Sequence, residues 1–269
     1  MTRTLPDQPV HWDTGEPPPH ASATPPDPWA ALRRHTPARI SLGRAGTSLP
    51  TSEVLRFAAA HAAARDAVHL PLAVDALLAD LRARGFEAST ATSRAGSRTE
   101  YLTRPDLGRV LAPAGVDALA ADGAGGLCIV VADGLSAIAA QRHAVPLLVA
   151  LRDVGVTGDR IAVATQARVA LGDAIGERVG AAIVLVLIGE RPGLSSPDSL
   201  GAYLTWAPKT GRVDSERNCV SNIRPEGLPI ADAAARIAWL VRESQRRRVT
   251  GIGLKDDSDV LRLAGDAAT

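Results

Sequence analysis

The stretch LCIVVADG at residues 127–134 decides the fold of this 269-residue chain. It is an uninterrupted apolar run that ends at Asp133-Gly134, as in a strand that is buried on both faces and followed by a turn. Two runs of the same kind follow, IAVAT at 161–165 and AIVLVLI at 182–188. Helical patterns separate the three runs. This alternation predicts an α/β fold with a Rossmann-like, doubly wound, mostly parallel sheet.

The flanking regions complete this predicted fold. Residues 200–206 alternate apolar and polar side chains, which favours an additional strand at the edge of the sheet. Residues 230–247 carry an apolar stripe at helical spacing, so a long amphipathic helix is expected there. Residues 123–269 are therefore predicted to form a Rossmann-like domain.

The region before residue 123 has a different pattern. Helical periodicity is expected from Ser48, with Ser48 or Thr51 as the cap, through Val68, at 74–84 before Gly85, and from Pro105-Asp106 to about residue 121. These segments predict a helix-rich N-terminal subdomain at residues 29–122. Nine of the 19 prolines lie in the first 37 residues, which favours a Pro-rich disordered tail at residues 1–28.

Composition excludes several classes of function. Lys and Arg number 30 and Asp and Glu number 29, so the chain lacks the basic excess that binding to nucleic acid or to a membrane surface requires. Aromatic residues make up 3%, which argues against a base-stacking surface. No secretory apolar region and no apolar run of roughly 20 residues is present, so neither export nor a membrane span is expected.

The cysteines and histidines give no metal signature. Cys128 and Cys219 are the only cysteines, and no C-x-x-C pair occurs. The histidines lack H-E-x-x-H or any other paired ligand spacing. A reducing cytosol and a chain without metal ligands are expected.

Polar groups mark the ends of the predicted parallel strands. Ligands of open α/β sheets bind outside the carboxyl ends of the strands, and this rule selects the loops at 133–136, 166–169 and 189–193. Glu190 follows an apolar strand directly, so its carboxylate is placed to accept hydrogen bonds from ligand amides or hydroxyls. Pairing of Glu190 with Arg191 or with a loop amide is an equally good interpretation.

Common catalytic motifs are missing from the sequence, and no catalytic residue is assigned. There is no G-x-x-x-x-G-K-[ST], and no G-x-G-x-x-G follows a strand. Ser136 resembles a nucleophile elbow, but Ile138 stands where that motif needs glycine, so Ser136 is interpreted as a helix cap. The residues alone predict a ligand-binding α/β domain. A regulatory module that binds a nucleotide in the same crevice, and a hydrolase using Ser136, remain the alternatives.

Five short strings occur together and in order in the sequence. They are SRAGSR at 93–98, YLTRPDLGR at 101–109, DGLS at 133–136, GERPGL at 189–194 and RNCVSNI at 217–223. Together they resemble the small (light) subunit of ethanolamine ammonia-lyase, and the resemblance extends from about Arg39 to Asp256.

This resemblance implies an adenosylcobalamin-dependent lyase that converts ethanolamine to acetaldehyde and ammonia. In that family a large barrel subunit holds the substrate, and the small subunit covers the cobalamin at the interface. The resemblance therefore accounts for the missing catalytic residues, because the cofactor supplies the difficult chemistry. It makes the large subunit and cobalamin the expected partners.

The resemblance also implies which residues contact the cofactor: Val169, Glu190 and Cys219. Cys219 is expected to be a small, soft contact and not a cobalt ligand; a buried structural thiol is the other interpretation. The D-x-H-x-x-G motif that replaces the cofactor's own base with histidine is absent, since Asp66-Ala67-Val68-His69 has a different spacing. Base-on cobalamin is therefore expected.

Two locations are compatible with the resemblance, the cytoplasm and the interior of an ethanolamine-utilisation bacterial microcompartment. Some members of the family carry an amphipathic leading helix associated with encapsulation, whereas this chain starts with a Pro-rich segment. The sequence therefore favours the cytoplasm.

Overall fold

The computed structural model describes residues 29–114, 119 and 125–258. Contacts between residues divide the chain into two units, 1–57 and 58–269. In the first unit, the Arg33 guanidinium donates to the carbonyl oxygens of Ile40 and Ser41. The Arg39 guanidinium carbon lies 5.7 Å from the centre of the Phe57 ring. The rest of the description concerns the second unit, which contains the sheet.

The described elements, in chain order, are η1 (Ala30–His35), α1 (Thr51–His69), α2 (Val74–Ala83), β1 (Ala88–Thr92), α3 (Arg98–Thr103), η2 (Leu107–Arg109), β2 (Leu127–Ala132), α5 (Ala137–Asp153), β3 (Arg160–Thr165), α6 (Leu171–Arg178), β4 (Ile183–Gly189), β5 (Leu200–Trp206), η3 (Asp214–Glu216), β6 (Asn218–Ile223), α7 (Ile230–Arg247) and η4 (Gly251–Gly253).

The sheet has six strands in the order β1-β3-β2-β4-β5-β6 and is mixed. The pairs β1–β3, β3–β2 and β2–β4 are parallel, whereas β4–β5 and β5–β6 are antiparallel. The predicted α/β class is confirmed, but the prediction of a mostly parallel sheet is wrong. The reason lies in the connections, because no α-helix lies between β4 and β5 or between β5 and β6 to carry the chain back for a parallel pairing.

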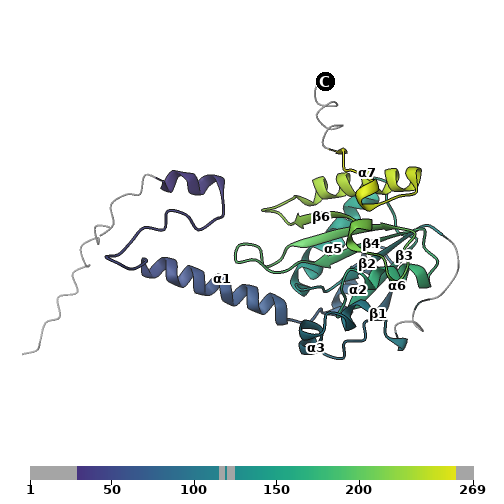
Figure 1. The fold of residues 1–269 in the computed structure, drawn as a ribbon, viewed down its shortest axis with the longest axis horizontal. Coiled ribbons are helices and arrows are strands. Elements are labelled where there is room, and N and C mark those ends of the chain that lie inside the picture. Colours follow the sequence, from purple (N-terminus) through teal and green to yellow (C-terminus); the bar gives the residue numbers. More distant parts are fainter. Residues whose placement is uncertain (1–28, 115–118, 120–124, 259–269) are drawn as a thin grey trace, which may run out of the picture. The chain divides into compact units, whose positions relative to one another are not determined.

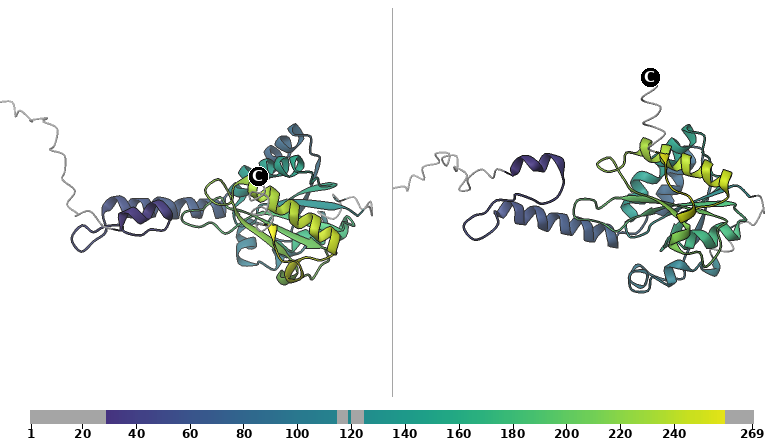
Figure 2. Two further views of the ribbon diagram at one scale, coloured as in Figure 1. Left: turned by 90° about the horizontal axis from the view of Figure 1, so that it is seen from above. Right: turned by 45° about the horizontal axis from the view of Figure 1, so that its top comes forward.

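Apolar side chains on the two faces of the sheet form two cores. One core contains Ile129, Val131 and Leu185 and is covered by α2, α5 and α7; the other contains Val130 and Val186 and is covered by α6. Figure 1 shows α7 along one side of the strands, and Figure 2 shows it crossing over them when viewed from above. Three of the described helices cover one face of the sheet and one covers the other. The predicted doubly wound, Rossmann-like arrangement is therefore not confirmed.

Long apolar runs were predicted correctly, and strands of small or polar residues were missed. All six residues of β2 are buried, as the sequence predicts for a strand covered on both faces. The sequence of β1 is ASTAT and that of β6 is NCVSNI, so neither has an apolar run that identifies a strand. Because β6 lies outside β5, the predicted strand at 200–206 is not the edge strand.

The prediction of one helix from residue 105 is wrong over residues 105–112. The structure has α3 earlier, where the Ser97 side chain accepts a hydrogen bond from the Glu100 N–H and caps the helix. After the short turn η2, Val110 is extended and Leu111 forms a β-bridge with Ser93; helical conformation appears again at residues 113–114. The helices predicted through Val68, at 74–84 and at 230–247 agree with α1, α2 and α7.

The predicted boundary near residue 122 stays a prediction. Strand β1, which lies before that boundary, pairs with β3 over five residues. The predicted disordered tail at 1–28 lies outside the described residues. Among the described helices, none is both long and apolar enough to span a membrane.

Candidate functional site

The three loops selected from the sequence lie together at the carboxyl ends of β2, β3 and β4, because β2 pairs with both other strands. Asp133 joins two of the loops by accepting hydrogen bonds from the backbone N–H groups of Gln166 (2.8 Å) and Ala167 (2.9 Å). Arg98 Nη1 donates to the same carboxylate at 3.3 Å. Burial raises the pKa of Asp133, while these donors act in the opposite direction.

Two glycines allow the first and third loops to approach closely. Gly134 has φ +55°, and a Cβ there would overlap the carbonyl oxygen of Gly189. A Cβ at Gly189 would in turn overlap the carbonyl oxygen of Ser136. The Leu135 N–H donates to the Gly189 carbonyl at 2.9 Å. The two loops therefore form one backbone surface at the end of the sheet.

A pocket of about 430 Å³ opens at this end of the sheet, and we call it the strand-end pocket. Val169 and Glu190, two of the predicted contact residues, both line it and are both half-buried. The lining residues are Tyr101, Gly134, Leu135, Arg168, Val169, Ile188, Gly189, Glu190, Arg191 and Tyr203. The pocket thus combines apolar side chains, glycine backbone, two cations and one carboxylate.

Hydrogen bonds to Ser199 and Asn222 fix the position of Glu190. Its Oε2 accepts a hydrogen bond from the Ser199 hydroxyl and a second from the Asn222 N–H at 3.2 Å. The Glu190 N–H donates to the Ser199 carbonyl at 2.9 Å. These bonds agree with the interpretation that Glu190 pairs with a loop amide. No hydrogen bond to its other oxygen, Oε1, is recorded in the described part of the chain.

Cys219 joins the site through Tyr203, which the sequence analysis did not single out. The two residues are direct partners in the β5–β6 register, and their side chains are hydrogen-bonded. Cys219 is exposed, yet partial desolvation of its sulfur raises the pKa of the thiol, so the thiol is protonated at neutral pH. Burial also raises the pKa of the Tyr203 hydroxyl. Tyr203 lies on β5, away from the strand ends to which the crevice rule points.

Tyr101 is a second residue of the pocket that the sequence analysis missed. It is fully buried, and its hydroxyl donates to the Ala167 carbonyl at 3.0 Å. The guanidinium carbons of Arg98 and Arg168 lie 4.7 and 4.4 Å from its ring centre. Burial raises the pKa of Tyr101 to about 12. The hydrogen bond to Ala167 and the contact with Arg168 tie Tyr101 to the loop that carries Val169.

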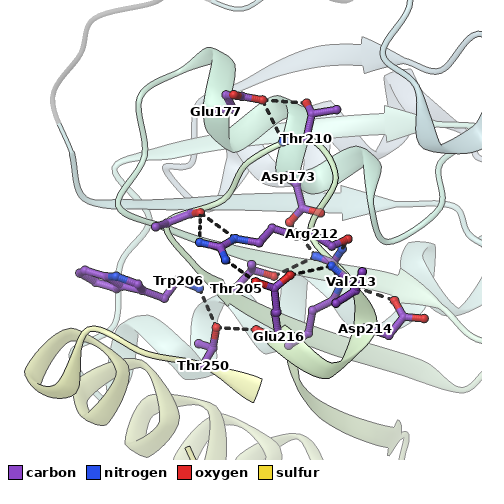
Figure 3. A network of polar contacts seen from close by, with 12 residues as sticks. Asp173, Glu177, Thr205, Trp206, Thr210, Arg212, Val213, Asp214, Glu216 and Thr250 are labelled. Atoms are coloured by element: carbon purple, nitrogen blue, oxygen red, sulfur yellow. Dashed lines mark hydrogen bonds and ion pairs between the residues drawn. The ribbon is translucent and has the colours of Figure 1, made fainter. Parts of the chain in front are cut away.

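A buried ion pair connects the elements that carry Val169 and Cys219. Arg217 Nη1 lies 2.6 Å from Asp173 Oδ1, and the two side chains are 2% and 1% exposed. Asp173 lies in the first turn of α6, just after the Val169 loop, and Arg217 directly precedes β6. Arg217 also donates to Thr205 Oγ1 on β5 at 3.1 Å. Figure 3 shows the surrounding polar network.

The donor and acceptor groups of the strand-end pocket fit a corrin cofactor. A corrin periphery carries amide side chains and apolar edges, which match the Glu190 carboxylate and the apolar surface of Val169. Arg168 lines the pocket, and its buried Nε has no hydrogen-bond acceptor among the described residues. Among the described residues, no group of three or more His, Cys, Asp or Glu side chains is arranged to hold a metal ion.

Ser136 is not placed for nucleophilic chemistry. It is fully buried, accepts from the Ala139 N–H and donates to the Pro197 carbonyl at 2.8 Å. The predicted role as the cap of a helix is confirmed, since α5 starts at the next residue.

Comparisons with known proteins assign the chain to a family. A model of the ethanolamine ammonia-lyase light chain family (EutC) matches residues 26–255. A relative from Azotobacter vinelandii, an ethanolamine ammonia-lyase small subunit, is 54% identical over 248 residues, which cover 89% of this chain and 92% of the relative. Small subunits from Ralstonia nicotianae and Pseudomonas syringae pv. tomato are 54% and 52% identical, over 87% and 91% of this chain and 90% and 88% of their own lengths. The resemblance seen in the short strings is thus confirmed, and the chain belongs to the ethanolamine ammonia-lyase light chain family.

Proposed function

We propose that this chain is the subunit that covers adenosylcobalamin in an ethanolamine ammonia-lyase, and that it acts with a large barrel subunit to convert ethanolamine to acetaldehyde and ammonia. The observation that carries the proposal is the grouping of the expected contacts. Val169 and Glu190 line one pocket, and Cys219 is hydrogen-bonded to Tyr203 of the same pocket. These residues come from three separate segments of the chain.

In this proposal the residues of this chain bind the cofactor and shield it from water, and none of them takes part in a chemical step of the reaction. The Glu190 carboxylate accepts from amide N–H groups of the cofactor, Val169 covers apolar corrin edge, and Cys219 makes a small contact beside Tyr203. Exclusion of water from the interface protects a reactive intermediate. When bound, the cofactor supplies the radical chemistry that protein side chains lack.

The cofactor is proposed to bind with its own base in place. The sequence lacks the D-x-H-x-x-G motif, and no histidine occurs among the described residues that line the strand-end pocket. This chain then contributes no ligand to the cobalt. We place the assembled enzyme in the cytoplasm, with the interior of a bacterial microcompartment as the other location.

Titration with hydroxocobalamin tests the proposal without requiring turnover. The complex of this chain with its large subunit, and each subunit alone, are titrated and the absorption spectrum of the corrin is recorded. We expect tight binding by the complex only, and a spectrum in which the cofactor's base remains on the cobalt.

Binding that does not require this chain would contradict the proposed covering role. A spectrum showing that a histidine has displaced the cofactor's base would contradict the base-on assignment.

A further inference from the structure

A second pocket, of about 330 Å³, lies beside the strand-end pocket and shares Arg168 and Val169 with it. We call it the arginine pocket. Its charged lining residues are Arg109, Arg168, Arg212, Arg217 and Asp214. Arg109 and Arg217 lie in two of the strings that carry the family resemblance, but nothing in the sequence indicates that the four arginines meet, because they come from separate segments of the chain.

Two of the four arginines, Arg217 and Arg212, use their guanidiniums mainly for contacts within the fold. Arg217 is paired with Asp173, and its Nη2 donates to the Arg212 carbonyl at 2.8 Å. Arg212 donates twice to the Ala207 carbonyl, at 3.2 and 3.0 Å, and forms an ion pair with Glu216. Figure 3 shows Arg212 within this network. Carboxylates pair with both guanidiniums, and the Arg217 Nε, which has no hydrogen-bond acceptor among the described residues, lies 3.5 Å from Asp214 Oδ1.

The other two arginines retain free donors. Arg109 is exposed, and its guanidinium makes no hydrogen bond or ion pair with any part of the chain that the structure describes; its backbone N–H donates to the Asp106 carbonyl at 3.2 Å. Arg168 makes one long bond, from Nη2 to the Tyr101 carbonyl at 3.4 Å, while its Nε is buried without an acceptor. The Arg168 N–H donates to the Gly108 carbonyl at 2.8 Å, which ties the backbone of Arg168 to the turn that carries Arg109.

Backbone donors add to this set. The N–H groups of Val169 and Ala170 precede α6 and have no acceptor within the described residues. The start of a helix favours an anion, and arginine guanidiniums bind phosphate oxygens through paired hydrogen bonds. The nearby carboxylates pair with the other two arginines, Asp173 and Asp214 with Arg217 and Glu216 with Arg212. Among the described residues, no carboxylate pairs with Arg109 or Arg168.

We propose that the arginine pocket binds the phosphodiester group of the cobalamin nucleotide, with Arg109 and Arg168 as its side-chain donors. The inference rests on the proposed function. Cobalamin carries an anionic phosphodiester in the arm that links its base to the corrin, at some distance from the ring. Two adjoining pockets with a shared wall, one suited to amides and apolar edge and the other to an anion, match the two parts of such a ligand.

The test compares cobalamin with cobinamide, a corrinoid that lacks the phosphodiester and the base. Both ligands are titrated into the complex with the large subunit, using the wild-type chain, Arg109→Gln, Arg168→Lys and the control Arg94→Gln. Arg94 is an exposed arginine whose N–H bonds to the carbonyl of Val110, so it lies close to Arg109 without lining the pocket. The readouts are the dissociation constant and the ³¹P chemical shift of bound cobalamin.

We expect Arg109→Gln to weaken cobalamin binding about tenfold and to move the ³¹P shift toward that of the free ligand, with cobinamide binding unchanged. Arg168→Lys should weaken cobalamin more than cobinamide, because lysine lacks the planar fork. Arg94→Gln should change neither ligand. Millimolar inorganic phosphate should compete with cobalamin and leave cobinamide unaffected.

Three results would overturn the proposal. The first is equal weakening of cobalamin and cobinamide by Arg109→Gln, and the second is no weakening of either. The third is that phosphate binds in the pocket without competing with cobalamin, which identifies free phosphate as the occupant. Failure of the proposed function itself looks different, because the wild-type complex would then bind neither corrinoid.

Discussion

The Arg217–Asp173 pair is the charged contact most deeply buried beside the site, and it connects α6, β5 and β6. Arg217→Met leaves Asp173 buried without its partner, so we expect the free energy of unfolding to fall by about 3–5 kcal/mol. Urea unfolding of the isolated chain measures this. The double variant Asp173→Leu/Arg217→Met is the control and should be more stable than Arg217→Met alone.

The stability that Arg217→Met loses should depend on pH. Burial raises the pKa of Asp173 above its ordinary value of 3.8, and removal of Arg217 raises this pKa further. A carboxyl with a raised pKa in the folded state costs stability as pH rises through that pKa. Arg217→Met should therefore be closest to wild type below about pH 4 and least stable near neutrality. A deficit that does not change with pH would contradict this account of Asp173.

Glu190 is expected to matter more for the cofactor than for folding. In Glu190→Gln the amide oxygen still accepts from Ser199 or Asn222, so the free energy of unfolding should change by less than about 1 kcal/mol. Cobalamin binding by the complex should weaken by roughly fivefold to tenfold, because the charged acceptor is lost.

Glu226→Gln is the matched control for this prediction. Glu226 is an exposed carboxylate paired with Arg224 after β6, outside the strand-end pocket. Equilibrium dialysis with hydroxocobalamin compares the two variants. Equal affinities for Glu190→Gln and wild type would remove Glu190 from the set of proposed contacts.

Sequence position could point to Glu190 and Val169 because both lie at ends of buried parallel strands, where a general rule places ligands. No such rule covers Tyr203 or Arg109. Tyr203 reaches the pocket because β5 pairs antiparallel with β4, and Arg109 reaches its pocket because the Gly108 carbonyl bonds to Arg168. Both placements depend on contacts between distant segments, which a single sequence does not reveal.

Among the helices, α5 offers the clearest test of an assigned cap. Ser136 accepts from the Ala139 N–H at 3.3 Å and donates to the Pro197 carbonyl at 2.8 Å. Ser136→Ala removes both bonds and should lower the free energy of unfolding by about 1–3 kcal/mol. Thermal unfolding measures the loss. Ser97→Ala, which removes the exposed cap of the shorter helix α3, should cost less.

Ser136→Ala also distinguishes between the two interpretations of Ser136, as a helix cap or as a nucleophile. Acetaldehyde formation per folded complex should be the same for Ser136→Ala and wild type. A loss of activity by several orders of magnitude in a complex that folds and binds cobalamin would restore the hydrolase-like interpretation of Ser136.

Elements with a strong pattern were predictable, and elements defined by their neighbours were not. The three apolar runs and the amphipathic α7 carry their own burial signal. By contrast, β1 consists of Ala, Ser and Thr, and it is a strand because it pairs with β3. No continuous helix starts at Pro105, because the Ala112 N–H bonds to the Thr92 carbonyl and holds residues 110–112 beside β1.

For the whole chain, the near-neutral charge and the lack of catalytic motifs in the sequence predict a ligand-binding α/β protein without catalytic residues of its own. The chain belongs to the light chain family, and the covering role proposed for it would account for the missing motifs, because such a subunit needs binding groups and a stable fold more than reactive side chains. The polar groups that the structure concentrates at one end of the sheet are of that kind.

Reconstitution of the enzyme tests this account most directly. The chain is co-expressed with its large subunit, and acetaldehyde formation from ethanolamine is measured with adenosylcobalamin and with each of the three components omitted in turn. We predict activity only when both chains and the cofactor are present. Activity of this chain alone, or undiminished activity of the large subunit without it, would contradict the account.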